Sequence, residues 1–199
     1  MSGREPAPDS GPPTSRSRRI VLVAIAAALF VGAGLRFGAD PLLPAYVVFF
    51  ACLVVISDVD VRRHTIPNRL LYPAGTACLV LLAGGAVIGG HPGRLVGALV
   101  GAGVAWAALL CVHLTSPEAM GFGDVRLAFL LGLFLGWLSL GHVVLGIFAG
   151  FVFGAVVGIG LLVTGARGRH DVLAFGPFLC AGAAVAILAG GPLLGLWPG

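Results

Sequence analysis

Residues 143–165 read VVLGIFAGFVFGAVVGIGLLVTG, a run without a single charged side chain. About 20 mostly apolar residues are enough for one helix to cross the hydrocarbon core of a bilayer. Glycine recurs at every fourth position of this run, so the glycines share one helix face, where they let a neighbouring membrane helix approach closely. We therefore predict a transmembrane helix that packs through a glycine stripe; a glycine-lined translocation groove is the functional alternative. The stripe consists of Gly146, Gly150, Gly154 and Gly158, and a shorter one of Gly97 and Gly101.

The composition of the whole chain agrees with this stretch. Of its 199 residues 58% are hydrophobic and only 10% are charged, and the mean hydropathy is +1.05. Soluble domains carry about 25% charged residues, so the composition excludes a soluble globular enzyme. The net charge of +4 comes from arginine without any lysine, which is no sign of nucleic-acid binding. The fold predicted is an all-α polytopic membrane protein, a bundle of about seven transmembrane helices.

Apolar runs divide the chain into a tail and a membrane domain. Residues 1–19 are rich in Pro, Ser, Gly and Arg and predict a disordered, basic, cytoplasmic tail, followed by one membrane-embedded domain over 20–199. A cleaved signal peptide is the alternative for the first apolar run, but no clear A-x-A cleavage site lies at the end of this run, before the next turn. The spans are expected near residues 20–38, 42–59, 70–90, 94–114, 125–141, 143–165 and 172–196, with only Gly141 and His142 between the fifth and the sixth.

Arginines predict the orientation of these spans. With the N-terminus in the cytoplasm, only Arg36 and Arg94 lie outside and all other arginines lie inside, as the positive-inside rule requires. An odd number of spans then places the C-terminus outside. The expected location is the cell membrane, with the lipid bilayer as the surroundings of the chain.

Acidic residues near a bilayer are rare and mark functional sites. Only eight are present, and three of them lie in the tail or on an outer loop. The remaining five are expected on the cytoplasmic side, where Asp171 is explained as a helix-start acid and Glu118, with His113, as interfacial polar residues or a gate for substrate. The five are Asp58, Asp60, Glu118, Asp124 and Asp171.

Two of these acids lie in segments with distinctive sequences. Residues 57–68 read SDVDVRRHTIPN, in which an apolar helix ends in acids and arginines before a proline that prevents simple continuation. Residues 120–127 read MGFGDVRL, in which two glycines open the backbone just before Asp124. Both segments place an aspartate at the same membrane depth.

Two carboxyl groups at one depth suggest acid–base chemistry. A close pair tends to share a proton near neutral pH, so one member can activate water while the other protonates the scissile carbonyl. Neither a nucleophilic side chain nor a metal is needed, and the five scattered histidines and four single cysteines offer no metal-ligand spacing. We therefore expect no cofactor and no metal.

Three segments of the chain are characteristic: the pattern from Asp60 to Asn68, the GFGD of residues 121–124 and the FGPFL of residues 175–179. Together they resemble the type IV prepilin peptidases, which are GxGD-type membrane aspartic peptidases. The likeness covers the chain from about residue 42 to 190. It implies an aspartic endopeptidase that cleaves the leader of a prepilin or pseudopilin, with its active site facing the cytoplasm.

The resemblance also implies roles for individual residues. Asp60, seven residues before Pro67, and Asp124 would form the catalytic pair, and Asp58 is the alternative partner. Glycines 121 and 123 would let substrate approach Asp124. The residues expected to bind substrate or support the site are Gly121, Gly123, Pro67, Asn68, Phe175, Gly176 and Pro177.

Two departures from the family pattern qualify this implication. The larger members carry an insert with paired Cys-x-x-Cys motifs and also methylate the new pilin N-terminus; this chain has no Cys-x-x-Cys pair, so methylation is not implied. The chain resembles instead the short, peptidase-only form that serves Flp or tight-adherence pili. Asn68 stands where many longer members have Asp.

Two other function classes remain open. A small proton- or cation-coupled transporter would place acids well inside its spans and often contain an internal repeat, whereas the acids here lie at span ends. A non-catalytic assembly factor for a pilus is the other. The sequence does not indicate an oligomeric state.

Overall fold

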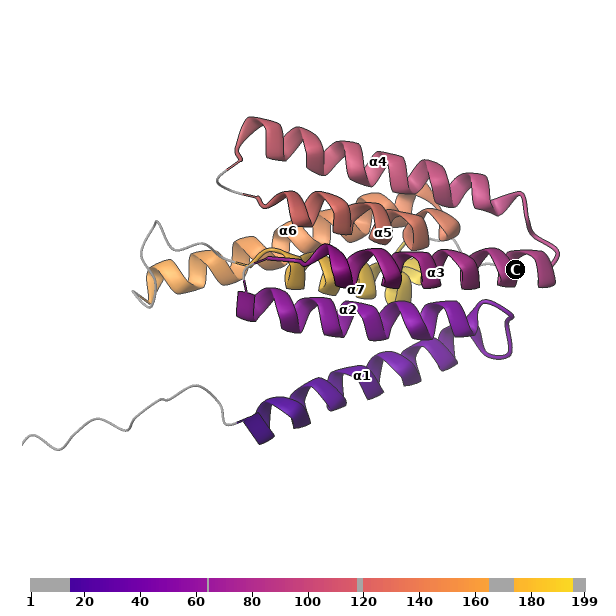
Figure 1. The fold of residues 1–199 in the computed structure, drawn as a ribbon, viewed down its shortest axis with the longest axis horizontal. Helices are drawn as coiled ribbons and strands as arrows, with labels where there is room; N and C mark the ends of the chain where they lie inside the picture. The colour runs from indigo at the N-terminus through magenta and orange to yellow at the C-terminus, as the bar shows by residue number, and fades with distance from the viewer. Residues whose placement is uncertain (1–14, 64, 118–119, 165–173, 195–199) are drawn as a thin grey trace, which may run out of the picture.

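The computed structural model describes residues 15–63, 65–117, 120–164 and 174–194. Within them, every regular element is an α-helix, and the helices run roughly along one common direction (Figure 1). Five are long and apolar enough to cross a membrane: α1, α2, α3, α4 and α6. The all-helical, polytopic prediction is confirmed. The helices are α1 (Ser15–Phe37), α2 (Leu43–Arg63), α3 (Asn68–Ile88), α4 (Arg94–Thr115), α5 (Phe122–Leu138), α6 (Leu140–Val163) and α7 (Gly176–Leu194).

Helices α4 and α5 form the tightest pair, and glycine makes this possible. A Cβ atom on Gly101 would lie 2.5 Å from the Cα of Gly136, and one on Gly132 would lie 2.4 Å from the carbonyl oxygen of Gly101. The two backbones therefore touch without side chains between them. The prediction that Gly97 and Gly101 mark a packing face is confirmed.

Helices α6 and α7 pack in the same way. The Cβ positions of Gly146, Gly150 and Gly154 lie against Leu135 of α5, Leu179 of α7 and Phe175, respectively. Gly158 has nothing within 4 Å of its Cβ position, so the predicted stripe ends one turn early. The reason is that α7 begins at Gly176, close to Gly154, so the last part of α6, which contains Gly158, extends beyond the start of α7.

Large aromatic side chains, rather than glycines, separate α2 from α5. The Phe49 ring stacks on the Phe134 ring with centroids 4.1 Å apart, and the Tyr46 hydroxyl donates a hydrogen bond to the carbonyl oxygen of Phe134 at 3.1 Å. All three side chains are fully buried. These rings set the spacing between the two helices that carry Asp60 and Asp124.

The boundary between α5 and α6 differs from the prediction. The chain breaks at Ser139, whereas the sequence interpretation placed the break at Gly141 and His142. Ser139 has an extended backbone, and its hydroxyl accepts a hydrogen bond from the backbone N–H of His142, so it is the N-cap of α6. The capping serine thus starts the helix at Leu140, three residues before the predicted span.

Two other helix ends also differ from the expected spans. Helix α1 begins at Ser15, inside the region assigned to the tail, while residues 1–14 lie outside the described part of the chain. Helix α7 begins at Gly176, four residues later than the predicted span, and Asp171 with its neighbours lies outside the described residues.

Candidate active site

The two aspartates in the distinctive segments lie at one end of the bundle. Asp60 is in the last turn of α2 and Asp124 in the first turn of α5; since the helices alternate in direction, these turns fall at the same end as the start of α7 (Figure 1). Their exposed fractions are 4% and 7%. Buried carboxyl groups need polar partners or each other, so this end of the bundle holds the candidate site.

The first residue of α7 brings the two carboxyl groups together. The backbone N–H of Gly176 donates a hydrogen bond to Asp60 Oδ2 over 3.1 Å. A Cβ on Gly176 would lie 2.6 Å from that oxygen and 3.5 Å from Asp124 Oδ1. Both carboxyl groups therefore border one point in space, and the two oxygens are no farther apart than the sum of these distances.

Glycine at position 176 thus has a steric reason. The approach of 2.6 Å leaves no room for a methyl group unless the carboxyl group of Asp60 moves. The N-terminus of α7 also presents a partial positive charge to Asp60, which favours an anionic oxygen there.

The two distinctive segments also contact each other directly. Ile66 is 5% exposed, and the Cβ position of Gly123 lies 3.3 Å from its Cβ. Pro67 has an extended backbone at the N-cap of α3, and its carbonyl oxygen accepts hydrogen bonds from Leu70 and Leu71 at 3.0 and 3.2 Å. Pro67 therefore turns the chain from the end of α2 into α3 while Ile66 covers the start of α5.

Glycine 121 lies beside Asp124 as its helix cap. The Asp124 N–H donates to the carbonyl oxygen of Gly121 at 3.0 Å. A Cβ on Gly121 would lie 3.7 Å from Asp124 Oδ2, an ordinary contact distance. The residue is exposed, so its open backbone borders the side of Asp124 that faces outward from the helix end.

The remaining residues of the predicted set surround the site at greater distance. The Phe175 ring packs on the Phe151 ring with centroids 5.0 Å apart. Pro177 lines an apolar groove of about 360 Å³ between α1, α2 and α7, which also reaches Ser57, one turn before Asp60. Phe175 and Pro177 thus support the start of α7.

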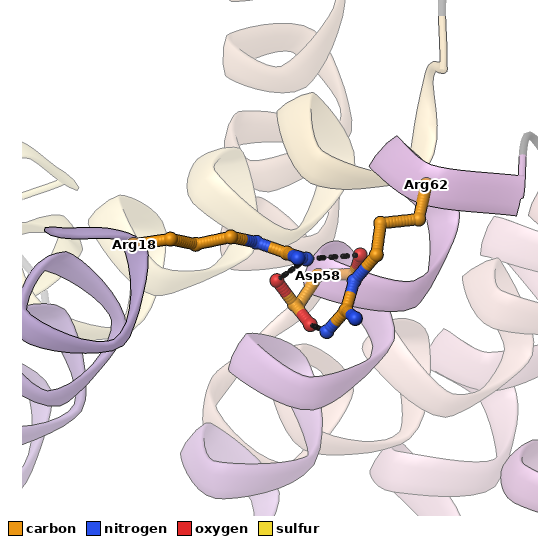
Figure 2. Close-up of polar contacts among 3 residues, drawn as sticks. All are labelled: Arg18, Asp58 and Arg62. Carbon is orange, nitrogen blue, oxygen red and sulfur yellow. Dashed lines mark hydrogen bonds and ion pairs between the residues drawn. The ribbon is translucent and has the colours of Figure 1, made fainter. Parts of the chain in front are cut away.

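Asp58, the alternative catalytic partner, is occupied by two arginines. Figure 2 shows its carboxylate between Arg18 of α1 and Arg62, one turn later on α2, with an ion pair to each. Arg18 also donates to the backbone oxygen of Asp58 at 3.4 Å. Asp58 therefore ties α1 to α2 beside the site.

Sequence reasoning missed two features of the candidate site. It gave Gly176 only a supporting role, although this residue supplies a hydrogen bond to Asp60. It used Arg126 only as one of the arginines expected on the cytoplasmic side, although its guanidinium donates to Asn68 Oδ1 and lies over the Phe122 ring, 4.6 Å from the centroid. Its place two residues after Asp124, in a chain with so few charges, is the signal that could have found it.

Other predicted polar residues have local roles or lie outside the description. His113 Nδ1 is 2.8 Å from the carbonyl oxygen of Met120, and the His113 ring contacts Phe122, so it fixes the segment before α5. Glu118 lies outside the described residues. Among the residues that the structure describes, no group of three or more His, Cys, Asp or Glu side chains could hold a metal ion.

The fold and the site together define a multi-pass membrane protein in which two carboxyl groups lie close together at one end of the helix bundle. The model of the type IV leader peptidase family matches residues 47–159, more than half of the chain. The chain therefore belongs to the type IV leader peptidase family.

Curated relatives agree with the family model. A prepilin leader peptidase/N-methyltransferase of Bacillus subtilis is 29% identical over 87% of this chain and 66% of its own length. One of Burkholderia pseudomallei is 35% identical over 83% of this chain and 52% of its own length. The leader peptidase HopD of Escherichia coli is 32% identical over 71% of this chain and 90% of its own length. No solved structure matches the chain.

The relatives differ from this chain in extent. The chain spans between about half and two thirds of the length of the two N-methyltransferase relatives, but nearly all of the shorter leader peptidase HopD. Membership of the family follows from these matches.

Proposed function

We propose that the chain is a membrane aspartic endopeptidase that cleaves the leader peptide from a type IV prepilin of the Flp or tight-adherence kind. The observation that carries the proposal is the meeting of the Asp60 and Asp124 carboxyl groups at Gly176. The names of the relatives, prepilin leader peptidase and leader peptidase, supply the substrate class. The proposal covers leader cleavage only.

The proposed mechanism follows from the chemistry of a close carboxyl pair. Two carboxylates at this separation repel when both are ionised, so the pair is expected to hold one proton near neutral pH. The ionised member takes a proton from a water molecule that attacks the scissile carbonyl carbon, while the protonated member donates to the carbonyl oxygen. When the amine leaves, the carboxyl group that took the proton from water donates it to the amine, and the other carboxylate takes a proton back from the tetrahedral intermediate. The two groups thereby exchange roles.

Within this mechanism the Gly176 hydrogen bond gives the pair an asymmetry. An N–H donor at the start of a helix favours the ionised form of the oxygen that it contacts. We therefore assign Asp60, which accepts this bond from the start of α7, as the base. Asp124, whose carboxyl group contacts the backbone of Gly121, is assigned as the acid.

Arginines support a cytoplasmic position for the site. Arg62, Arg63, Arg69 and Arg126 lie at the same end of the bundle as Asp60 and Asp124, whereas Arg36 and Arg94 lie at the opposite end. Under the positive-inside rule the end with more arginines is cytoplasmic. A prepilin with a basic leader in the cytoplasm would present its cleavage site at this membrane boundary.

Substitution of the two aspartates tests the proposal. Asp60→Asn and Asp124→Asn keep the side-chain shape but remove the ionisable group, so we expect each to lower prepilin cleavage by at least about a thousandfold. Cleavage is followed in proteoliposomes by the mass of the released leader. Asp58→Asn is the matched control, because it makes the same substitution two residues from Asp60, on a carboxyl group that pairs with Arg18 and Arg62. It should retain cleavage within about threefold.

The outcomes of this experiment are distinct. Normal cleavage by both Asp60→Asn and Asp124→Asn would refute the peptidase assignment. Loss of cleavage in Asp58→Asn and Asp124→Asn, with Asp60→Asn active, would transfer the role of base to Asp58.

A further inference from the structure

Among the residues that the structure describes, Arg126 forms the one polar bridge between the first turns of α3 and α5. Its guanidinium donates to Asn68 Oδ1, the first residue of α3, and lies over the ring of Phe122, the first residue of α5. A planar guanidinium can donate and stack at the same time, which an ammonium group does less well. A single side chain thus contacts both segments that carry the catalytic aspartates.

The rest of the α3–α5 boundary explains why such a bridge matters. An apolar groove of about 320 Å³ separates the two helices, lined on the α3 side by residues from Leu71 to Leu79 and on the α5 side by residues from Arg126 to Leu133. Leu130 and Leu133 of α5 line this groove together with Trp106 of α4. Two contacts near the site join the start of α5 to the start of α3 and to the residue before Pro67: Arg126 on Asn68, and Gly123 on Ile66.

The aromatic rings set the spacing of α2 and α5 about three turns away from the aspartates, whereas this junction links the two aspartate-bearing segments close to the site. Asp60 is followed along the chain by Ile66, Pro67 and the start of α3, whereas Asp124 lies one residue after Gly123 and two before Arg126. A movement at the mouth of the groove would change the distance between α3 and α5, and with it the geometry of the carboxyl pair.

On the basis of the proposed function, we propose that Arg126 and Asn68 are a positioning pair that holds the Asp60 and Asp124 segments in register for leader cleavage. Arg126 acts through the carboxyl pair and does not touch the reacting atoms. Because a misplacement of about 1 Å at a reacting pair lowers the rate by around a hundredfold, the bridge affects turnover more than substrate affinity.

The test compares kcat and KM for a prepilin in proteoliposomes. We expect Arg126→Gln and Asn68→Ala each to lower kcat by about ten- to a hundredfold while KM changes by less than about twofold. Arg126→Lys keeps a cation that can reach Asn68 and should recover most of the lost kcat. Arg69→Gln is the matched control, since it removes the same charge from an exposed position next to Asn68, and its kcat should equal that of the parent.

The double variant separates a pair from two independent effects. If Arg126 and Asn68 act through each other, the double variant Arg126→Gln with Asn68→Ala loses no more kcat than the single variant that has the larger loss. Losses that multiply, a rise in KM alone, an unchanged kcat in Asn68→Ala, or an equal loss in Arg69→Gln would each overturn the inference. If Arg126→Gln does not accumulate in the membrane, the comparison of Asn68→Ala with Arg126→Lys decides the matter.

Failure of this inference is distinguishable from failure of the proposed function. Inactive Asp60→Asn and Asp124→Asn together with a fully active Arg126→Gln would leave the peptidase assignment standing and remove only the positioning pair. Active Asp60→Asn and Asp124→Asn would remove the peptidase assignment itself.

Discussion

Gly176 combines two functions in one residue, because its N–H contacts Asp60 and its missing side chain makes room for the Asp60 carboxyl group. The N–H donates at 3.1 Å, and a Cβ would come within 2.6 Å of the same oxygen. Any other residue here must either push the carboxyl group away or move the start of α7. The site thus depends on a backbone contact that no side-chain motif describes.

Gly176→Ala should therefore impair cleavage without unfolding the protein. We expect kcat to fall by about ten- to a hundredfold, because the Asp60 oxygen must move by several tenths of an ångström or more to avoid the methyl group. Prepilin cleavage in proteoliposomes measures the effect. Gly160→Ala is the control, since its Cβ position is free of neighbours within 4 Å, and equal activity of the two variants would contradict the steric argument.

At the scale of helices, glycine and aromatic contacts divide the bundle into tight and spaced pairs. Backbones of α4 and α5 touch through Gly101, Gly132 and Gly136, whereas aromatic rings hold α2 away from α5. The tight pair fixes Asp124 on a rigid helix, and the spaced pair leaves a defined gap at whose end the two carboxyl groups meet.

Gly132→Ala should destabilise the bundle. A methyl group there would lie 2.4 Å from the carbonyl oxygen of Gly101 and 2.6 Å from the Cβ of Ala105, so α4 and α5 must separate. Overpacking of this kind lowers the free energy of unfolding by about 1–3 kcal/mol. Thermal unfolding in detergent, followed by circular dichroism, should show a lower Tm, whereas Gly103→Ala, whose Cβ position is open, should leave Tm unchanged; equal values would contradict this packing.

The elements were predictable from the sequence to different degrees. Long apolar runs determine where helices form, and two distinctive segments were enough to select Asp60 and Asp124. The break at Ser139 was not predictable, because apolar residues flank it on both sides and one serine cap outweighs them only through its bond to His142. The contacts of Gly176 and Arg126 join residues more than 50 positions apart in the chain, so local patterns do not encode them.

Across the whole molecule, the alternating directions of the helices gather the end of α2 and the starts of α3, α5 and α7 at one face (Figure 1). The arginines near that face should hold it in the cytoplasm. The distribution of arginines thus predicts which compartment the carboxyl pair faces.

Fusions to alkaline phosphatase, which is active only outside the cytoplasm, test this orientation. A fusion after Gly90, between α3 and α4, should be active, and one after Ser116, between α4 and α5, should be inactive. Fusion protein levels on immunoblots provide the control for expression. The reverse pattern would place the carboxyl pair on the outer face.

The hydrogen bond from Gly176 to Asp60 also makes one backbone amide a spectroscopic reporter. The chemical shift of an amide proton depends on the charge of its acceptor, and this acceptor is one of the two proposed catalytic oxygens. In a sample labelled with ¹⁵N-glycine, the Gly176 resonance would follow the proton on Asp60 as pH changes. It would also register any inhibitor that displaces this carboxyl group, without a modified residue in the site.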